Sequence, residues 1–582
     1  METKWSKFYP EELRDFQVDT EDTLYTCMRS ACEKFGKRTA YQFFLRRFSY
    51  QEFIKQIDLA ADGWYQLGVR PGDKVLICMG GCPQVFISVY ALDKIGATSV
   101  LCIPDEQPDN LLKLSDALRA RFALMSRNQA ANYSEILERS TVEKLVIGRY
   151  YDYLDFVSNL YYSFSDLSVY DNTRIGKLKT TYVYWSDIMY KATREHAPLN
   201  TDNIHDAVCF VPNTSKENAV CTAFSSKALV LSSRANSFIH SEREKKLGRP
   251  SRVLCLNEHA FVFTFTIGMN DVLITGQTYI IFTWYNVDNI VYATRVSKPD
   301  TLVAYTGTAA KFNGYAVSPQ VLKKVTALIT GEGLFTAAQK AGLIDISESA
   351  RGKLDFYHVR GSEETAGYAY VSPDTLSDRS MGIPLPGTIM KAVDRSSLMD
   401  ARAGSTGELA VYNHSFCNAN ILEDGERESP YVKLQDGRRW YFTGVIGKEN
   451  PDGSFLKYGF VSNEYKINST PVYPERVDKT IALIRGVMDV RSIVINDIKG
   501  PLLISEVVPH ESYFYNSDLL ESLEKRIREE CSAMLPAAMN PSEIHFAAKL
   551  PVDSKGRTDY ASLEERARRN HELLAGEIEE DN

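Results

Sequence analysis

SYQEFIKQIDLAADGWYQLGV, residues 49–69, opens the stretch of sequence that decides the fold. RPGDKVLICMGG (70–81), PQVFISVYALDKIGA (83–97) and TSVLCIP (98–104) follow it almost without a break. The first and third segments have apolar residues at helical spacing and end near a glycine. The second and fourth contain short apolar runs typical of buried strands. Helices that alternate with apolar strands predict βαβ units and a mostly parallel sheet, and therefore an α/β fold.

The pattern changes further along the chain. The same alternation recurs in residues 203–235, 251–305 and 322–358. From about residue 380, short apolar runs separated by turn residues predict antiparallel strands. Strand and helix signals return after residue 461.

The length of the chain, 582 residues, exceeds what one hydrophobic core supports. We therefore predict two domains with a boundary near Gly459. Residues 1–458 would form a large domain of βαβ subdomains plus a β region. Residues 459–582 would form a small α+β domain.

The charge balance excludes several classes of protein. The 67 Lys and Arg residues stand against 75 Asp and Glu, for a net charge of −8. The chain therefore lacks the basic excess of a nucleic-acid-binding protein or of a polybasic membrane anchor. Because the N-terminal residues show no apolar stretch of signal-peptide length, we expect a cytoplasmic protein.

The most apolar long stretch runs from Ala260 to Tyr285, with Asn270, Asp271 and Gly276 inside it. Its β-branched and aromatic residues predict a buried pair of strands, and we expect no integral membrane segment. The ten cysteines lack the spacing of metal ligands, which predicts reduced thiols in the core.

Nine short phrases, in their order and spacing, resemble the adenylate-forming superfamily, most closely the long-chain fatty acyl-CoA synthetases. They are FSYQEF (48–53), LGVRPGDKV (67–75), CPQVFISVYALDKIGA (82–97), GIPLPGT (382–388), STGELAV (405–411), YFTGVIG (441–447), NPDGS (450–454), VYPERV (472–477) and LPVDSKGRTDYASL (550–563).

The resemblance implies the adenylate-forming fold, with a small mobile C-terminal domain. It also implies ATP and Mg²⁺, an acyl substrate, and CoA or an acyl carrier protein as thiol acceptor. In that superfamily a carboxylate attacks the α-phosphate of ATP, and a thiol then takes the acyl group from the adenylate. Because a fold does not by itself establish a reaction, each motif has to be compared with the chemistry it serves.

The stretch that corresponds to the superfamily's phosphate loop is VPNTSKENAVCTAFSSKALVLSS, residues 211–233. Thr214, Ser215 and Lys227 are its candidates for phosphate contacts. No glycine occurs between Gly176 and Gly248, so a nest of backbone N–H groups would need non-glycine residues in strained conformations. We predict that this loop no longer holds a triphosphate.

The superfamily's Tyr-Gly-x-Thr-Glu motif reads here RGSEE, residues 360–364. Arg360 replaces the aromatic residue that stacks on adenine, and Glu363 replaces the threonine. Gly361 and Glu364 are retained, and Glu364 would be the Mg²⁺ ligand. A second carboxylate beside Glu364 works against phosphate binding. An alternative interpretation, a surface loop with an Arg–Glu pair, stays open.

Three further motifs are altered. The aspartate that binds the ribose hydroxyls is replaced in the triplet Thr443-Gly444-Val445, and valine cannot accept those hydrogen bonds. The arginine of the next Gly-Arg pair is Phe460, although Lys466 downstream is retained. The C-terminal catalytic lysine is Arg557, whose planar fork differs from a compact ammonium.

The acyl side of the site has its own candidates. His259 occupies the position of a histidine or aromatic residue near the acyl entrance, although a buried core histidine is an equally open interpretation. Gly331 and Gly333 resemble a Gly-rich strand end that lines the pocket, and Tyr305 and Gly307 lie just before a predicted helix.

These losses together favour a degenerate long-chain acyl-CoA synthetase-like protein, since positioning and charge supply most of adenylyl-transfer catalysis. It would bind an acyl group or acyl thioester, or act as partner of an active paralogous ligase, without adenylating at a normal rate. One alternative is an active fatty-acid or other carboxylic acid ligase, with CoA or acyl carrier protein, rebuilt around Arg360, Glu364 and Arg557. Another is an acyl transferase that needs no ATP.

Overall fold

A computed structural model provides the structure of the protein. It describes residues 4–165, 168–176, 178, 180–191, 196–201, 207–212, 219–283, 287–306, 308–309, 324–331, 354–371, 380–467, 470–497, 500–514, 516–551 and 558–580.

Residues 49–104 fold as their sequence pattern predicts. Residues 50–67 form helix α3 (Tyr50–Leu67), which begins at a capping box made by Ser49 and Glu52. The helix ends at Gly68, whose φ of 111° lies in the left-handed region that glycine adopts without strain. Strand β3 (Lys74–Cys78), helix α4 (Pro83–Ile95) and strand β4 (Thr98–Leu101) follow, and β3 pairs with β4 in parallel.

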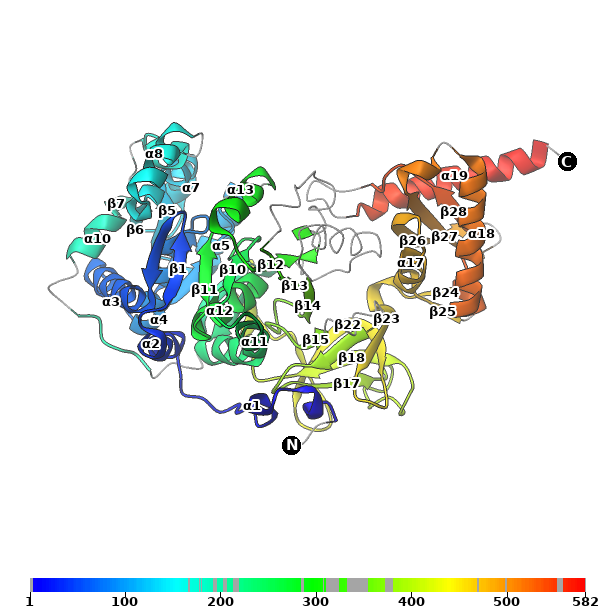
Figure 1. The fold of residues 1–582 in the computed structure, drawn as a ribbon, viewed down its shortest axis with the longest axis horizontal. Coiled ribbons are helices and arrows are strands. Elements are labelled where there is room, and N and C mark those ends of the chain that lie inside the picture. The colour runs from blue at the N-terminus through cyan, green and yellow to red at the C-terminus, as the bar shows by residue number, and fades with distance from the viewer. Residues whose placement is uncertain are drawn as a thin grey trace.

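Two large sheets make up most of the molecule (Figure 1). Within the described residues the first sheet has nine strands and is parallel around β3. Across the sheet they are β20 (Arg427–Glu428), β19 (Ala419–Leu422), β9 (Ala219–Ser225), β8 (Ala207–Pro212), β4, β3, β5 (Phe122–Ser126), β6 (Lys144–Gly148) and β7 (Thr181–Tyr184).

The second sheet has fourteen strands in the described part of the chain. Across the sheet they are β17 (Ile389–Val393), β18 (Gly407–Tyr412), β22 (Arg439–Glu449), β23 (Phe455–Phe460), β16 (Ser380–Pro384), β15 (Ala369–Val371), β14 (Asp355–Arg360), β13 (Ala327–Gly331), β12 (Thr301–Tyr305), β10 (Arg252–Cys255), β11 (Thr278–Ile281), β1 (Thr39–Phe43) and β2 (Arg46–Ser49), with β21 (Tyr431–Lys433) beside β22.

Parallel and antiparallel pairing divide the second sheet as the sequence predicts. Strands β10 to β14 pair in parallel, whereas β14 to β18, β22 and β23 pair in antiparallel fashion. One continuous core contains residues of both sheets together with α4 and helix α11 (Ser226–Leu247). Because α4 is buried on almost every side, its sequence is apolar all round.

The prediction of a strand pair in residues 260–285 is wrong. This stretch forms a π-helix, η4 (Thr264–Asn270), then helix α12 (Asp271–Ile274) and the single strand β11. The side chain of Asn270 donates to Ser233 Oγ at 2.8 Å and accepts from the Tyr90 hydroxyl at 2.7 Å. A segment that is buried all round lacks the polar face by which a helix is recognised.

No helix in the described residues is long and apolar enough to cross a membrane. All ten cysteines are buried and form no disulfide.

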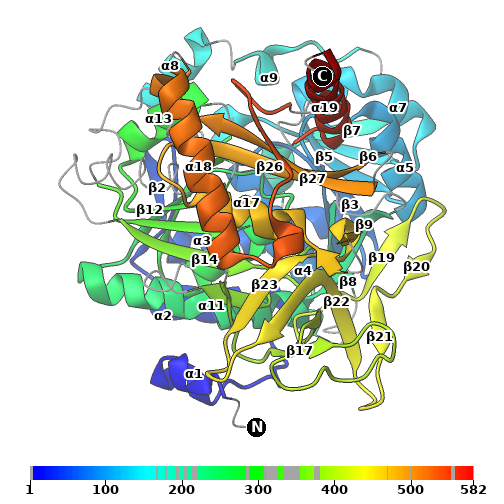
Figure 2. The same cartoon turned by 90° about the vertical axis from the view of Figure 1, so that its right-hand side faces the viewer.

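The C-terminal residues form a lobe of their own beyond β23 in Figure 1, and this lobe faces the viewer in Figure 2. Its main elements are α17 (Pro474–Ala482), β26 (Val487–Asp497), β27 (Gly500–Pro509), α18 (Ser517–Met534), β28 (Glu543–Phe546) and α19 (Tyr560–Glu580). Helix α17 packs against β23, and Ile446 of β22 joins the apolar cluster of the lobe. The boundary near Gly459 and the mobility of this lobe stay predictions.

Candidate functional site

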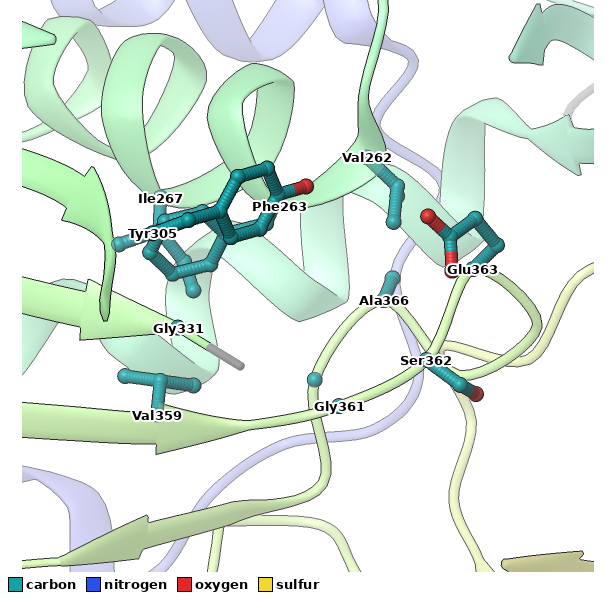
Figure 3. A pocket seen from close by; sticks show the side chains of 11 residues that line it. Val262, Phe263, Ile267, Tyr305, Gly331, Val359, Gly361, Ser362, Glu363 and Ala366 are labelled. Atoms are coloured by element: carbon teal, nitrogen blue, oxygen red, sulfur yellow. The ribbon is translucent and has the colours of Figure 1, made fainter. Parts of the chain in front are cut away.

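The carboxyl ends of three neighbouring parallel strands meet at one edge of the second sheet. Tyr305 at the end of β12 pairs with Gly331 at the end of β13, and Gly331 pairs with Val359 of β14. Arg360 ends β14, and the loop that follows it turns back along the same edge (Figure 3). Ligands of α/β proteins bind outside the carboxyl ends of parallel strands. We therefore take this edge as the candidate site.

Two cavities lie at this edge and share the backbone of Gly361 and Ser362. The first cavity has a volume of about 20 Å³ and is lined by Val262, Phe263, Ile267, Tyr305, Gly331, Val359, Gly361, Ser362, Glu363, Ala366 and Gly367. The second cavity has a volume of about 310 Å³ and is lined by Arg360, Gly361, Ser362, Tyr368, Met381, Tyr441, Thr443, Val445, Lys457 and Phe460.

Aromatic packing limits the first cavity. The rings of Phe263 and Tyr305 stack, with their centroids 5.3 Å apart. Figure 3 shows the two side chains together near Gly331. A Cβ atom at Gly331 would come within 2.7 Å of the Phe263 ring. The glycine at the end of β13 is therefore required by the close approach of this ring, a role that the sequence did not indicate.

The loop after β14 is tight because two glycines lie against each other. A Cβ atom at Gly361 would come within 2.8 Å of the Gly367 Cα atom, and Gly367 has a φ of 101°. The Tyr368 N–H donates to the Arg360 carbonyl at 2.8 Å and closes the loop. These contacts place both the backbone of Gly361 and the side chain of Arg360 beside the second cavity.

The second cavity is positively charged. Arg360 and Lys457 line it, and no carboxylate occurs among the described residues of its wall. Val445, at the position of the superfamily's ribose-binding aspartate, is buried in the same wall. The Thr443 hydroxyl donates to the Leu409 carbonyl at 2.8 Å, so this proton is already engaged.

Lys457 was missed by the sequence reasoning. Its side chain is 7% exposed, and its Nζ lies 3.2 Å from the centroid of the Phe460 ring. Within the described residues it has no hydrogen-bond or ion-pair partner. Burial holds the pKa of Lys457 well below its ordinary value, and repulsion from Lys479 and Arg360 adds to this effect. Side chains alternate between the two faces of a strand, so Lys457 lies on the same face as the buried Phe455. This alternation is the sequence signal that could have predicted the burial of Lys457.

Glu364 is a buried carboxylate, which excludes the interpretation of this motif as a surface loop. Its Oε2 accepts from the Tyr441 hydroxyl at 3.1 Å, and its Oε1 accepts from Asn420 Nδ2 at 3.4 Å. Arg360 and Glu363 are buried as well. A Mg²⁺ ion would find one carboxylate whose oxygens already accept hydrogen bonds. No group of three or more His, Cys, Asp or Glu side chains in the described residues is arranged to hold a metal ion.

The remaining predicted residues lie away from the two cavities or outside the described residues. Lys227 is in the first turn of α11, with its Nζ 3.2 Å from Asp19 Oδ1. Lys466 is exposed on strand β24 (Tyr465–Ile467). Thr214, Ser215, Gly307, Gly333 and Arg557 lie outside the described residues.

His259 has the environment of a core histidine. It is 1% exposed, lies edge-on to the Phe86 ring at 5.4 Å between centroids, and lines neither cavity. Neither ring nitrogen has a hydrogen-bond partner in the described part of the chain. Burial lowers the pKa of His259 to about 4, so the ring is neutral at pH 7.

Comparison with known proteins shows which proteins this chain resembles. Residues 28–215 match the AMP-binding enzyme family. Acetyl-coenzyme A synthetase of Chlorobaculum tepidum is 23% identical over 559 residues, which cover 90% of this chain and 78% of that protein. An isonitrile lipopeptide synthase of Streptomyces coeruleorubidus is 28% identical over 188 residues, 32% of this chain but only 12% of the synthase.

A solved structure matches over nearly the whole chain. An anthranilate CoA ligase in complex with anthranoyl-AMP superposes with a TM-score of 0.72 at 15% identity, covering 94% of this chain and 97% of that ligase. None of these proteins specifically supports the predicted closeness to long-chain fatty acyl-CoA synthetases. Residues 28–215 nonetheless match the AMP-binding enzyme family, the chain has the fold of the adenylate-forming ligases, and its resemblance to that superfamily is confirmed.

Proposed function

We propose that this chain binds a carboxylic acid or its thioester at the candidate site and does not adenylate it with ATP at the rate of an ordinary ligase. The observation that carries the proposal is the wall of the second cavity, where Arg360, Val445 and Lys457 stand and no described carboxylate is present. A ribose diol needs an acceptor there, and unpaired buried hydroxyls cost about 1–3 kcal/mol each.

The first cavity supports the acyl part of the proposal. Its wall is mostly apolar, and Phe263 and Tyr305 present ring faces to it. Apolar and aromatic side chains of this kind suit an aryl or alkyl group. A volume of about 20 Å³ holds little more than one water molecule, so binding of any such group requires the Phe263 ring to move. The ligand would be a free acid or a thioester of CoA or of an acyl carrier protein. With that ligand the chain would serve as partner of an active ligase.

The deciding experiment is carboxylate-dependent exchange of pyrophosphate into ATP, measured across fatty acids and aryl acids. We expect no exchange above background, while thioesters of one acid class raise the Tm of the protein. Exchange at the rate of an ordinary ligase with any acid in the panel contradicts the proposal.

A substitution at Val445 provides a matched control. V445D supplies an acceptor for the ribose hydroxyls, so we expect ATP·Mg²⁺ to bind at least tenfold more tightly than to wild type, since tenfold corresponds to about 1.4 kcal/mol. V445N, which lacks the charge, should give a smaller gain. Because Val445 is 4% exposed, both variants should lose stability relative to wild type.

A rebuilt ligase is the second candidate function, and the buried Glu364 favours it. E364Q separates charge from structure, because the Tyr441 hydroxyl can accept as well as donate and the amide can keep both hydrogen bonds. If the chain is a ligase, E364Q should abolish exchange that depends on Mg²⁺ while its Tm stays near that of wild type. Under the first proposal E364Q changes no ATP-dependent signal.

A further inference from the structure

The second cavity has charges that the adenylate-forming chemistry does not explain. We infer that it binds an organic phosphate whose phosphate group lies between Arg360 and Lys457. This inference rests on the proposed function in one respect, namely that the ribose of ATP does not occupy the same space.

The charge of the cavity selects an anion. Arg360 provides a planar fork of donors and Lys457 a compact ammonium, a pair suited to the oxygens of one phosphate group. Repulsion from Lys479 of α17 lowers the pKa of Lys457, whereas attraction to Glu475 of the same helix raises it. A phosphate dianion between the cations would relieve their mutual repulsion.

The cost of keeping Lys457 supports a binding role. A lysine that is 7% exposed and has no hydrogen-bond or ion-pair partner within the described residues destabilises the unliganded fold. Methionine or leucine would fill the same strand position without that cost. Buried charged side chains that are held in place before a ligand arrives are typical of binding sites.

The size and walls of the cavity select an organic phosphate over the free ion. At about 310 Å³ the cavity is large enough for a small organic molecule. Met381, Val445 and the Phe460 ring provide apolar surface beside the two cations. The ligand therefore has a phosphate at one end and a compact apolar group at the other.

Calorimetry on the full chain tests the inference with three probes: phenyl phosphate, inorganic phosphate and neutral benzyl alcohol. We expect phenyl phosphate to bind more tightly than inorganic phosphate, and benzyl alcohol not to bind. K457M and R360M should each weaken the binding of phenyl phosphate by at least tenfold, because each removes a charge-assisted contact. K433M, which removes an exposed lysine of β21 in the same sheet, should leave binding unchanged.

The melting temperature without ligand provides an independent measurement. K457M should raise the Tm of the unliganded protein, because it removes a desolvated cation, whereas removal of a purely structural lysine would lower it. The inference is overturned if phenyl phosphate fails to bind wild type or binds K457M equally well. Pyrophosphate exchange at an ordinary rate would instead contradict the proposed function and leave the phenyl phosphate result in place.

Discussion

Buried histidines make the stability of this protein sensitive to mild acid. Burial lowers the pKa of His259 and of His240 to about 4, from 6.5. Between these values the unfolded chain binds the protons that the folded chain excludes, so acid favours unfolding. Each histidine contributes about 3 kcal/mol that is fully present above pH 6.5 and is lost as the pH falls to 4.

Substitution of His259 therefore has a defined pH signature. H259F should remove about half of the decline in unfolding free energy that the two histidines cause between pH 6.5 and 4, because His240 still contributes its share. Urea denaturation at several pH values measures the effect. An unchanged decline would mean that His259 is not buried in the neutral form. Loss of acyl-thioester binding in H259F would instead support the prediction that His259 is a substrate-binding residue.

Single positions also show what the sequence could predict of the site. Arg360 and Val445 were found from motif positions, and both line the second cavity. The role of Lys457 depends on the packing of β23 against strands and a helix elsewhere in the chain. No local sequence pattern shows which neighbours the buried face of a strand will contact. That Lys457 has no hydrogen-bond or ion-pair partner among the described residues could therefore be seen only in the structure.

At the scale of elements, the segment around η4 contributes Val262, Phe263 and Ile267 to the wall of the first cavity. F263A removes the ring that packs on Gly331 and Tyr305, so we expect acyl thioesters of longer chain to raise the Tm of this variant and not that of wild type. The unliganded variant should lose about 2–4 kcal/mol of stability.

Phe261 offers the matched control for this variant. Its ring also contacts Tyr305, with centroids 5.9 Å apart, but it does not line the first cavity. F261A should leave the preference for chain length unchanged. The same change of preference in both variants would show that Tyr305, and not Phe263, limits the cavity.

Secondary structure was predicted correctly for some elements and wrongly for others, and the difference has a physical reason. Helix α3 has one buried face, a capping Ser49 and a terminal Gly68, so its period and both ends are visible in the sequence. Residues 264–270 of η4 are all buried, and an apolar run without a polar face carries no period. β-branched residues then favoured strands, although tertiary packing selected a helix.

At the scale of the whole molecule, nine phrases were enough to predict the fold, because their order and spacing resemble those of the adenylate-forming superfamily. The two cavities were not predictable in the same way. Their walls combine strands β12, β13, β14 and β16 with β22 and β23, which the sequence separates by long stretches. Their volumes depend on packing between elements.

The junction between β23 and the C-terminal lobe leads to a further prediction. A Cβ atom at Gly459 would come within 2.5 Å of the Tyr473 Cβ atom. G459A should therefore cost about 1–3 kcal/mol of stability and increase cleavage by a protease near residues 460–473. Limited proteolysis and urea denaturation measure both effects. G176A, where a Cβ atom meets nothing within 4 Å, is the control and should change neither.

Strand β23 contributes Lys457 to the second cavity and Gly459 to the contact with Tyr473. If the lobe adopts two orientations that differ in the packing of this strand, their equilibrium and anion binding are coupled. Coupling of this kind is reciprocal: the orientation that strengthens anion affinity is itself favoured by the bound anion, by the same factor. A ligand of the cavity would then act as an allosteric effector of the lobe, without touching it.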